Sequence, residues 1–268
     1  MSALLRWRES LAAWAIPPEI RAEESPWVLP REVFVRRADR QLERREGASL
    51  RLAEEAIGPS GGTVLDIGAA AGAASLPLRG ATEITAVDGD AELLAEFSRR
   101  ADGARTVLGH WPAVAASCTV ADVVVCHHVA YNVPDLAPFV AALTAHARRL
   151  VVLETAERHP LTALNPLWRH FHGVERPSGP TADDLVDCLR ELGIEPRVDR
   201  WRRAPAAEHP DFAALVEATR RRLCLPPSRL SEVDVQLREF GIDPALPPDL
   251  GSSGDDVVTL SWRPPVIH

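Results

Sequence analysis

The chain has 268 residues, of which 46% are hydrophobic and 25% are charged, a balance typical of soluble globular proteins. Its formal net charge of -8 argues against a general nucleic-acid-binding protein, because such proteins normally present a basic surface. No apolar run approaches the ~20 residues of a membrane-spanning helix, so we expect a cytoplasmic protein without a membrane partner.

An N-terminal helical cap is expected over residues 1–57. Apolar side chains recur at helical spacing in residues 4–14, and two prolines then stop the helix. A second helix is predicted over residues 32–57. The loop between the two helices carries Trp27, and the sequence leaves open whether this side chain packs on the body of the protein or belongs to a lid.

Short apolar runs alternate with helical patterns from residue 60 onward, which indicates a parallel sheet covered by helices on both faces. The predicted strands cover residues 63–67, 83–87, 105–108, 122–126, 149–154, 195–201 and 257–263. Helices are predicted at 72–78, 90–101, 136–147, from Thr181 onward, 211–223 and 231–240, with Asp90, Asp135 and the pair Thr181 and Asp184 as N-terminal caps. The fold class is therefore α/β, a seven-stranded doubly wound sheet in residues 58–268 with an N-terminal helical cap.

Two segments of this sheet domain are expected to be additions. Residues 205–245 form a helical insertion before the last strand, and residues 155–180 form a proline-rich loop that is expected to bind the substrate. Trp168 and His172 lie in this loop, where aromatic and imidazole groups suggest substrate recognition, although a short helix packed into the core is the alternative. The four cysteines are widely spaced and the histidines lack a third ligand at matching spacing, so no metal is expected.

The stretch TVLDIGAAAGAASLPL, residues 63–78, joins the first predicted strand to a run of small residues. Ligands of parallel α/β sheets bind at the carboxyl ends of strands, and small residues there let the backbone and the free N–H groups of a following helix approach a cofactor. Dinucleotides and S-adenosylmethionine both bind at such turns. A G-x-G-x-x-G dinucleotide pattern starting at Gly68 fails at Ala70 and Ala73, which disfavours an NAD-dependent oxidoreductase.

An acidic residue followed by spaced glycines is met by Asp66, Gly68 and Gly72 and is missed only at Ala70. In its strand and turn context, this stretch resembles the first motif of class I S-adenosylmethionine-dependent methyltransferases. The runs ITAVDGD, which contains Asp88, then TVLGHW and VVVCHHVAYNVPDLAPF extend the resemblance over residues 62–154 and, more weakly, to residue 263. The resemblance implies the strand order 3-2-1-4-5-7-6.

The cofactor implied by the resemblance is S-adenosylmethionine, with S-adenosylhomocysteine as the product. The resemblance assigns Asp88 to the ribose hydroxyls, the residues after the third strand to the adenine, and the backbone at His127 to the methionine amine. The implied cofactor-binding residues are Asp66, Gly68, Ala69, Ala70, Gly72, Asp88, Gly89, Gly109, His110, Trp111 and His127.

Catalytic candidates follow the fourth strand. Methyl transfer is an in-line displacement that requires alignment of the nucleophile and exclusion of water, and a histidine can take the proton of a hydroxyl or amine. His128 is the first candidate for this base, with Tyr131 as a second catalytic residue and Asn132 as a substrate-binding residue. A purely structural, hydrogen-bonded turn is the alternative for these three side chains.

The predicted function is methyl transfer to an oxygen or nitrogen nucleophile of a small molecule, and the oligomeric state is left undetermined. The acidic net charge favours a small molecule over nucleic acid. The alternatives are a methyltransferase acting on RNA or protein, and a catalytically inactive S-adenosylmethionine-binding sensor or scaffold. Ala70 bears on the last of these: its methyl group is tolerable at negative φ, whereas a positive φ would favour the inactive binder.

Overall fold

Seven strands form one sheet in the order β3-β2-β1-β4-β5-β7-β6, which confirms the predicted fold class and strand order. The computed structural model describes residues 1–22, 25–27, 29–250 and 256–265. All strand pairs are parallel except those of β7, which runs antiparallel to β5 and β6. The strands are β1 (Gly62–Ile67), β2 (Ala81–Asp88), β3 (Arg105–Leu108), β4 (Ala121–His127), β5 (Ala147–Ala156), β6 (Arg197–Arg202) and β7 (Asp256–Trp262).

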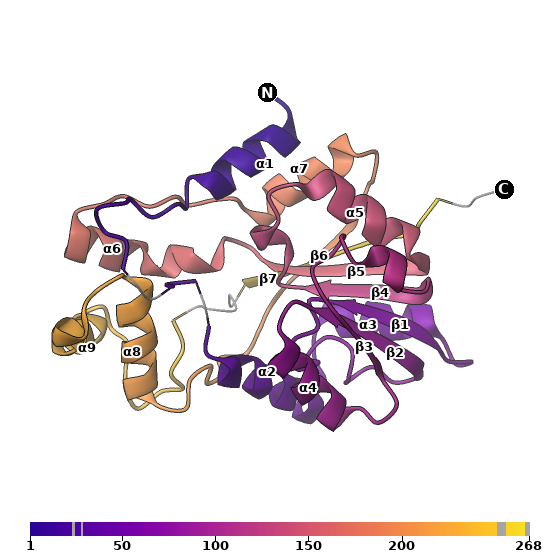
Figure 1. Ribbon diagram of the computed structural model, residues 1–268, viewed down its shortest axis with the longest axis horizontal. Helices are drawn as coiled ribbons and strands as arrows, with labels where there is room; N and C mark the ends of the chain where they lie inside the picture. The colour runs from indigo at the N-terminus through magenta and orange to yellow at the C-terminus, as the bar shows by residue number, and fades with distance from the viewer. Residues whose placement is uncertain (23–24, 28, 251–255, 266–268) are drawn as a thin grey trace.

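The central strands are buried on both faces, so successive side chains join two different cores. Leu65 and Val124 pack on one face with α1 (Ala3–Ala12), α5 (Leu136–Ala145) and α7 (Ala182–Glu191), as Figure 1 shows above the sheet. Val64 and Val123 pack on the other face, which is covered by α3 (Ala48–Ile57) and α4 (Ala91–Arg100). Two helices of the predicted N-terminal cap, α1 and α3, thus contribute to the cores of the sheet.

The single helix predicted over residues 32–57 is wrong, because the chain forms two helices there, α2 (Arg31–Glu43) and α3. Gly47 separates them with φ of +113°, a conformation that other residues rarely adopt. A Cβ atom at Gly47 would lie 2.9 Å from Cζ2 of Trp201. The glycine therefore permits both the break in the helix and the close packing of the Trp201 ring on the backbone.

The helix predicted over residues 72–78 is also absent, and this stretch forms consecutive turns instead. Pro77 explains the difference, because proline has no N–H to donate and disfavours helical geometry in the preceding residue, Leu76. We expected the first turn of a helix here to offer free backbone N–H groups to a cofactor. Because no helix forms, that source of N–H donors is missing from this stretch.

The predicted helix caps have different outcomes. The carboxylate of Asp90 accepts hydrogen bonds from two backbone N–H groups of α4, and Thr181 and Asp184 form a reciprocal capping box at α7, as predicted. Asp135 occupies the cap position of α5 but makes no capping hydrogen bond. Its carboxylate instead pairs with Arg8, at 3.4 Å.

A separate helical lobe lies beside the sheet, at the left of Figure 1. It contains α6 (Asn165–His172), α8 (Phe212–Arg222) and α9 (Leu230–Glu239), whose apolar side chains form a core of their own around Leu215 and Leu237. Short 3₁₀ helices at Ala115–Ser117, Ala130–Asn132, Pro160–Leu164 and Pro227–Arg229 complete the described elements. None of the helices in the described ranges combines the length and the apolar character needed to span a bilayer.

Candidate active site

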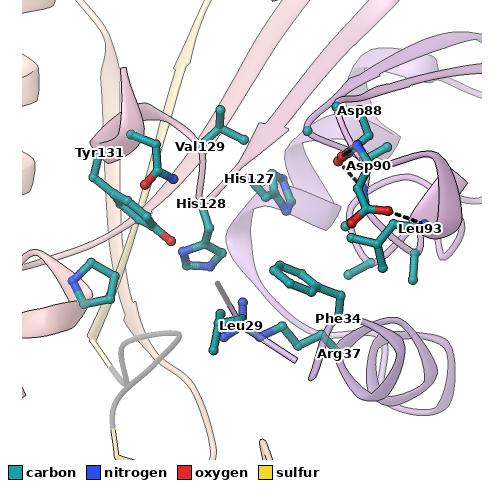
Figure 2. A pocket seen from close by; sticks show the side chains of 18 of the residues that line it. Leu29, Phe34, Arg37, Asp88, Asp90, Leu93, His127, His128, Val129 and Tyr131 are labelled. Atoms are coloured by element: carbon teal, nitrogen blue, oxygen red, sulfur yellow. Dashed lines mark hydrogen bonds between the residues drawn. The ribbon is translucent and has the colours of Figure 1, made fainter. Parts of the chain in front are cut away.

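A cavity of about 1910 Å³ opens at the carboxyl ends of β1, β2 and β4. Its sheet side carries Gly68, Asp88 and His127, while α2 and the helical lobe supply the opposite wall. Figure 2 shows Asp88 and Tyr131 at opposite sides of this space, with His127 and His128 between them. Most small-molecule pockets measure about 300–1,000 Å³, so the cavity has room for two ligands.

The glycine turn after β1 is held against the neighbouring strands. Gly68 has φ of +72°, and a Cβ there would overlap the side chain of Val129, which follows β4. The N–H groups of Gly68 and Ala69 both donate to the carbonyl of Val87, at 2.9 and 3.1 Å. The turn therefore presents its small Cα and Cβ groups to the cavity, and these two N–H groups are already used by the protein.

Gly72 has a packing role in this structure. Its φ is +98°, and a Cβ would overlap Leu76 and approach Phe97 within 3.1 Å. The cavity wall is made by the neighbouring residues Ala69, Ala70 and Ala71, and not by Gly72. The assignment of Gly72 to the cofactor therefore lacks support from the geometry.

Ala70 adopts φ of +45°, which is the conformation that favours the inactive binder of the two alternatives considered for this residue. Its N–H donates to Oδ2 of Asp88 at 2.8 Å, and this bond holds the residue in the left-handed conformation. Such a conformation costs an L-residue roughly 1–2 kcal/mol. The cost falls on a residue of the cavity wall, which is where backbone strain often accompanies function.

Replacing Ala70 with glycine is expected to raise the free energy of unfolding by about 0.5–1 kcal/mol. Glycine removes the left-handed strain, and its greater freedom in the unfolded chain offsets part of the gain. Chemical denaturation of the two proteins measures the difference. Ala74 lies in the same segment with no positive φ, so Ala74→Gly is the matched control and should destabilise. A lower free energy of unfolding in Ala70→Gly would contradict the claim that the left-handed conformation of Ala70 destabilises the fold.

Asp66 lies beneath the glycine turn and is fully buried, outside the set of residues that line the cavity. Its Oδ2 accepts a hydrogen bond from the hydroxyl of Ser75 at 2.6 Å, and within the described chain Oδ1 has no partner. Burial raises the pKa of Asp66 to about 7, although the Ser75 hydrogen bond opposes the shift. In this structure Asp66 ties the turn to the sheet and does not reach the cavity.

Asp88 ends β2 and faces the cavity. Oδ2 accepts the Ala70 N–H and Oδ1 accepts the Asp90 N–H, both at 2.8 Å, so the carboxylate is fixed in place. Each carboxylate oxygen has two acceptor sites, which leaves one on each oxygen for a ligand. A carboxylate with one free acceptor site on each oxygen can accept hydrogen bonds from two neighbouring hydroxyl groups of a ligand.

The residues predicted to hold the adenine, Gly109, His110 and Trp111, lie beside Asp88 together with Gly89, a further predicted cofactor-binding residue. Gly89, Gly109 and His110 line the cavity, and the His110 ring occupies the space into which a Cβ of Gly89 would extend. Trp111 also borders the cavity but is buried, and its indole N–H donates to the carbonyl of Phe139 at 3.4 Å. The predicted adenine residues are therefore brought together at one side of the cavity.

A buried polar network follows β4. Nε2 of His128 lies 3.2 Å from Oε1 of Glu154, and the same oxygen accepts a hydrogen bond from Arg203 at 2.8 Å. The other oxygen of Glu154 accepts the hydroxyl proton of Ser49, at 2.6 Å. Nδ1 of His127 lies farther away, at 4.0 Å from Glu154. Glu154 is thus the centre of the network and orients His128.

The charge state of this network follows from its burial. Desolvation lowers the pKa of His128 to about 4, although its hydrogen bond to Glu154 acts in the opposite direction. Burial also opposes the charge of Glu154, but His127, His128 and Arg203 together hold its pKa below the usual range. Nε2 of His128 lies 3.2 Å from the Glu154 carboxylate and 3.4 Å from the Arg203 guanidinium. The closer carboxylate only accepts hydrogen bonds, so it favours the neutral tautomer of His128 that carries the proton on Nε2. Its Nδ1, which has no partner among the described residues, keeps a lone pair.

The sequence reasoning missed Glu154, Arg203 and Ser49 as members of the site. Glu154 had a usable signal, because it ends the strand predicted over residues 149–154, and in the structure it pairs in register with His127 of the neighbouring β4. Arg203 follows β6, which lies at the edge of the sheet beyond β7, and no sequence pattern links it to β4.

His128 also has φ of +58°, a left-handed conformation that places it at the turn.

Tyr131 and Asn132 line the cavity next to His128, as expected from the sequence. Figure 2 shows the Tyr131 hydroxyl pointing toward the His128 ring, whose centroid lies 6.3 Å from that of Tyr131. Burial raises the pKa of Tyr131 to about 12, although Arg37, Arg222 and Arg203 act against the shift. Tyr131 is therefore a neutral phenol at physiological pH.

Trp168 and His172 do not reach the cavity, so their predicted substrate-binding role is corrected. They lie on α6, an amphipathic helix that replaces the expected loop. Trp168 is buried in the core of the helical lobe, and Nε2 of His172 lies 2.7 Å from the carbonyl oxygen of Leu223. The part of this segment that does border the cavity is His159–Leu161, which precedes α6.

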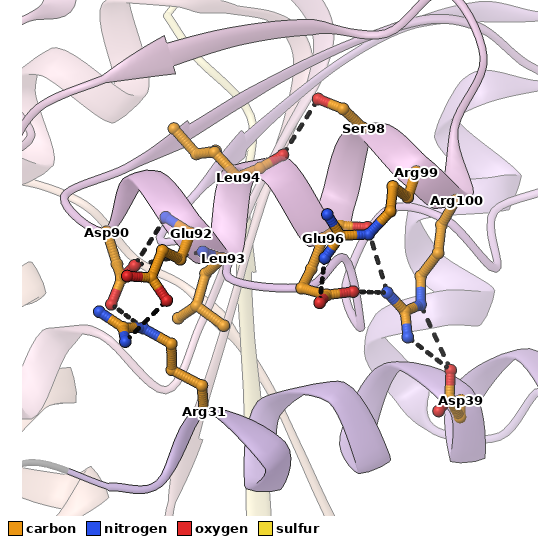
Figure 3. Close-up of polar contacts among 10 residues, drawn as sticks. All are labelled: Arg31, Asp39, Asp90, Glu92, Leu93, Leu94, Glu96, Ser98, Arg99 and Arg100. Atoms are coloured by element: carbon orange, nitrogen blue, oxygen red, sulfur yellow. Dashed lines mark hydrogen bonds and ion pairs between the residues drawn. The ribbon is translucent and has the colours of Figure 1, made fainter.

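Ion pairs fix α2 over the mouth of the cavity (Figure 3). Arg31 of α2 contacts Asp90, the N-terminal cap of α4, and Glu92 of that helix, each at 2.9 Å. Asp39 of α2 accepts a hydrogen bond from Arg100 of α4. Exposed pairs of this kind contribute about 0–1 kcal/mol each, so together they stabilise this position of α2 modestly. This position places Phe34 and Arg37 of α2 along the cavity wall.

A family model and two solved structures that are similar to this chain are all described as methyltransferases. The model of a methyltransferase domain family matches residues 36–197. A candidate methyltransferase from Bacillus halodurans C-125 superposes with a TM-score of 0.52 at 14% identity, over 82% of this chain and 99% of its own. The plantazolicin methyltransferase BpumL, solved with S-adenosylhomocysteine, gives 0.50 at 11% identity, over 98% and 96%. No curated protein sequence matches the chain.

Proposed function

This chain belongs to the class I S-adenosylmethionine-dependent methyltransferases, and from that premise we propose that it methylates an oxygen or nitrogen atom of a small molecule. The observation that carries the proposal is the pairing, in one cavity, of the Asp88 carboxylate with the His128 and Glu154 pair. The cavity volume, which exceeds that of a single-ligand pocket, supports simultaneous binding of cofactor and acceptor.

The residues present fit S-adenosylmethionine. Asp88 keeps one free acceptor site on each carboxylate oxygen, which suits the two hydroxyls of a ribose. Ala69 and Ala70 leave the turn without bulky side chains, and Nε2 of His127 is a buried polar atom without a partner in the described ranges. When bound, the cofactor supplies a methyl group on a sulfonium sulfur, which is open to displacement by a nucleophile.

The protein's own residues would activate and orient that nucleophile. Nδ1 of His128 is buried from solvent and has no partner among the described residues. With the acceptor bound against this ring, Nδ1 would accept the proton of the acceptor hydroxyl or amine, and Glu154 would stabilise the imidazolium that results. Tyr131 and Asn132 orient the acceptor from the same turn. α2 covers the opening and excludes water, which strengthens the electrostatic effect of Glu154 on His128.

Calorimetry and a turnover assay test the proposal in two steps. The protein should bind S-adenosylhomocysteine with micromolar affinity and show no binding of NAD. Incubation with S-adenosylmethionine and pooled small hydroxy and amino compounds should then release S-adenosylhomocysteine, together with a methylated product visible by mass spectrometry. Binding of NAD in place of S-adenosylhomocysteine would overturn the assignment.

One observation favours a second candidate, a cofactor-binding protein without turnover. Ala70 has a positive φ, a conformation in which glycine is unstrained and alanine is strained. A positive φ at this residue is the observation that was expected to favour an inactive binder. Such a protein would bind S-adenosylmethionine and leave it unchanged in the presence of the same compounds. Release of S-adenosylhomocysteine that depends on an added acceptor would exclude this candidate.

A further inference from the structure

Arg222, the last residue of α8, lines the cavity near Tyr131 and His159. Within the described part of the chain, no hydrogen bond or ion pair of its guanidinium is found, and Asp249 acts on it through electrostatic attraction. Burial, aided by the positive charge of Arg37, lowers the pKa of Arg222 to about 10. The group still carries its charge at physiological pH.

The neighbouring arginines have carboxylate partners. Glu208 pairs with Arg37 at 2.6 Å and with Arg40 at 3.0 Å, and Glu154 pairs with Arg203 at 2.8 Å. Placing a cation inside a protein without a paired anion is costly. The positive charge of Arg222 therefore lowers stability in the absence of a ligand, and an anion bound in the cavity would compensate it.

Aromatic rings form the wall beside Arg222. Trp14 stacks on His159 with ring centroids 4.3 Å apart, and Tyr131 meets the edge of His159 at 5.6 Å. Burial lowers the pKa of His159 to about 4, so this ring is neutral and does not compete for the anion. A cation next to flat, neutral rings suits a planar ligand that carries a negative group.

We propose that the methyl acceptor carries an anionic group, a carboxylate or a phosphate ester, that is bound by Arg222 while the rest of the acceptor lies against His159 and Tyr131. A guanidinium presents paired N–H donors that match either anion in a bidentate arrangement. This inference rests on the proposed function, because it identifies the class of acceptor that shares the cavity with the cofactor.

Calorimetry with benzoate, benzamide and inorganic phosphate tests the proposal on protein saturated with S-adenosylhomocysteine. Benzoate should bind at least about tenfold more tightly than the isosteric, neutral benzamide, because a charged hydrogen-bonded pair is involved. Arg222→Gln should lose this preference and should melt at the same or a higher temperature than the wild type without ligand. Tighter binding of phosphate than of benzoate would assign a phosphate ester, and the reverse a carboxylate.

Arg220→Gln is the matched control on the same helix. Arg220 is buried but bonded to Glu217 at 2.9 Å and to the carbonyl of Leu225, so its loss should lower the melting temperature and leave benzoate binding intact. Arg222→Lys keeps the charge without the planar fork and should retain a weaker preference for benzoate over benzamide.

Three results would overturn the inference: equal affinity for benzoate and benzamide, no binding of benzoate or phosphate, or a loss of thermal stability in Arg222→Gln as large as in Arg220→Gln. Failure of S-adenosylhomocysteine to bind in the same samples would instead count against the proposed function. The two failures are therefore distinguishable.

Discussion

Replacing Asp88 with alanine should weaken the binding of S-adenosylhomocysteine by about a hundredfold or more. The carboxylate faces the cavity with one free acceptor site on each oxygen, and hydrogen bonds to a charged group contribute about 1.5–3 kcal/mol each. The loss of two such bonds corresponds to about 3 kcal/mol or more, which is a hundredfold change in the dissociation constant. Isothermal titration calorimetry at fixed ionic strength measures it.

Asp122→Ala is a suitable control for Asp88. The carboxylate of Asp122 accepts a hydrogen bond from the backbone N–H of Thr63, on a neighbouring strand, at 2.9 Å. This contact lies at the amino ends of the strands, whereas the cavity lies at their carboxyl ends. This variant should lose stability and keep its affinity for S-adenosylhomocysteine. If Asp88→Ala binds the ligand as tightly as the wild type, the assignment of the ribose clamp is wrong, even though the family membership stands.

Replacing His128 with glutamine should lower kcat by about 10²–10⁴-fold and leave the affinity for S-adenosylhomocysteine unchanged. This range is the usual contribution of a positioned general base. Glutamine keeps a hydrogen-bond donor for Glu154 but provides no basic nitrogen in place of Nδ1. His170→Gln, an exposed change on α6, is the control and should keep full activity.

The pH dependence gives a second test of His128. Its pKa in the folded protein is about 4, below the usual 6.5, so the base stays unprotonated at neutral pH and its own titration should not limit kcat above about pH 5. As the pH falls from about 6.5 to about 4, the unfolded chain takes up this proton first, which destabilises the fold by up to about 3 kcal/mol. Denaturation of His128→Gln should show a smaller loss over this window.

Two results would contradict the account of His128. Full turnover in His128→Gln would show that proximity alone supports methyl transfer and that no base is needed at this position. An acidic limb of kcat near pH 6.5 that disappears in the variant would show that the imidazole has its ordinary pKa. The second result would place His128 in contact with water and not in the buried network with Glu154.

The sequence was sufficient for the features that depend on local pattern. The alternation of apolar runs with amphipathic stretches predicted all seven strands. The resemblance of the run ITAVDGD to a methyltransferase motif assigned Asp88 to the cofactor, and this residue lines the cavity. The capping box at Thr181 was readable because both of its partners lie within one helical turn.

Features that depend on contacts between distant segments were not readable. Arg203 reaches Glu154 across the sheet, and Arg222 reaches the cavity from an insertion between β6 and β7. Trp168 has a helical apolar pattern, but only the packing of the lobe shows that this face is turned away from the cavity. The positive φ of Ala70 depends on a hydrogen bond to Asp88 that no local propensity encodes.

A crystal structure with S-adenosylhomocysteine bound is the most direct test of this account. We expect the ribose hydroxyls on the carboxylate of Asp88, the adenine beside Gly109 and His110, and the sulfur directed toward His128 and Tyr131. A nucleoside bound elsewhere, or a sulfur that faces away from the His128 and Glu154 pair, would contradict the central claim that this one cavity holds both the cofactor and the base.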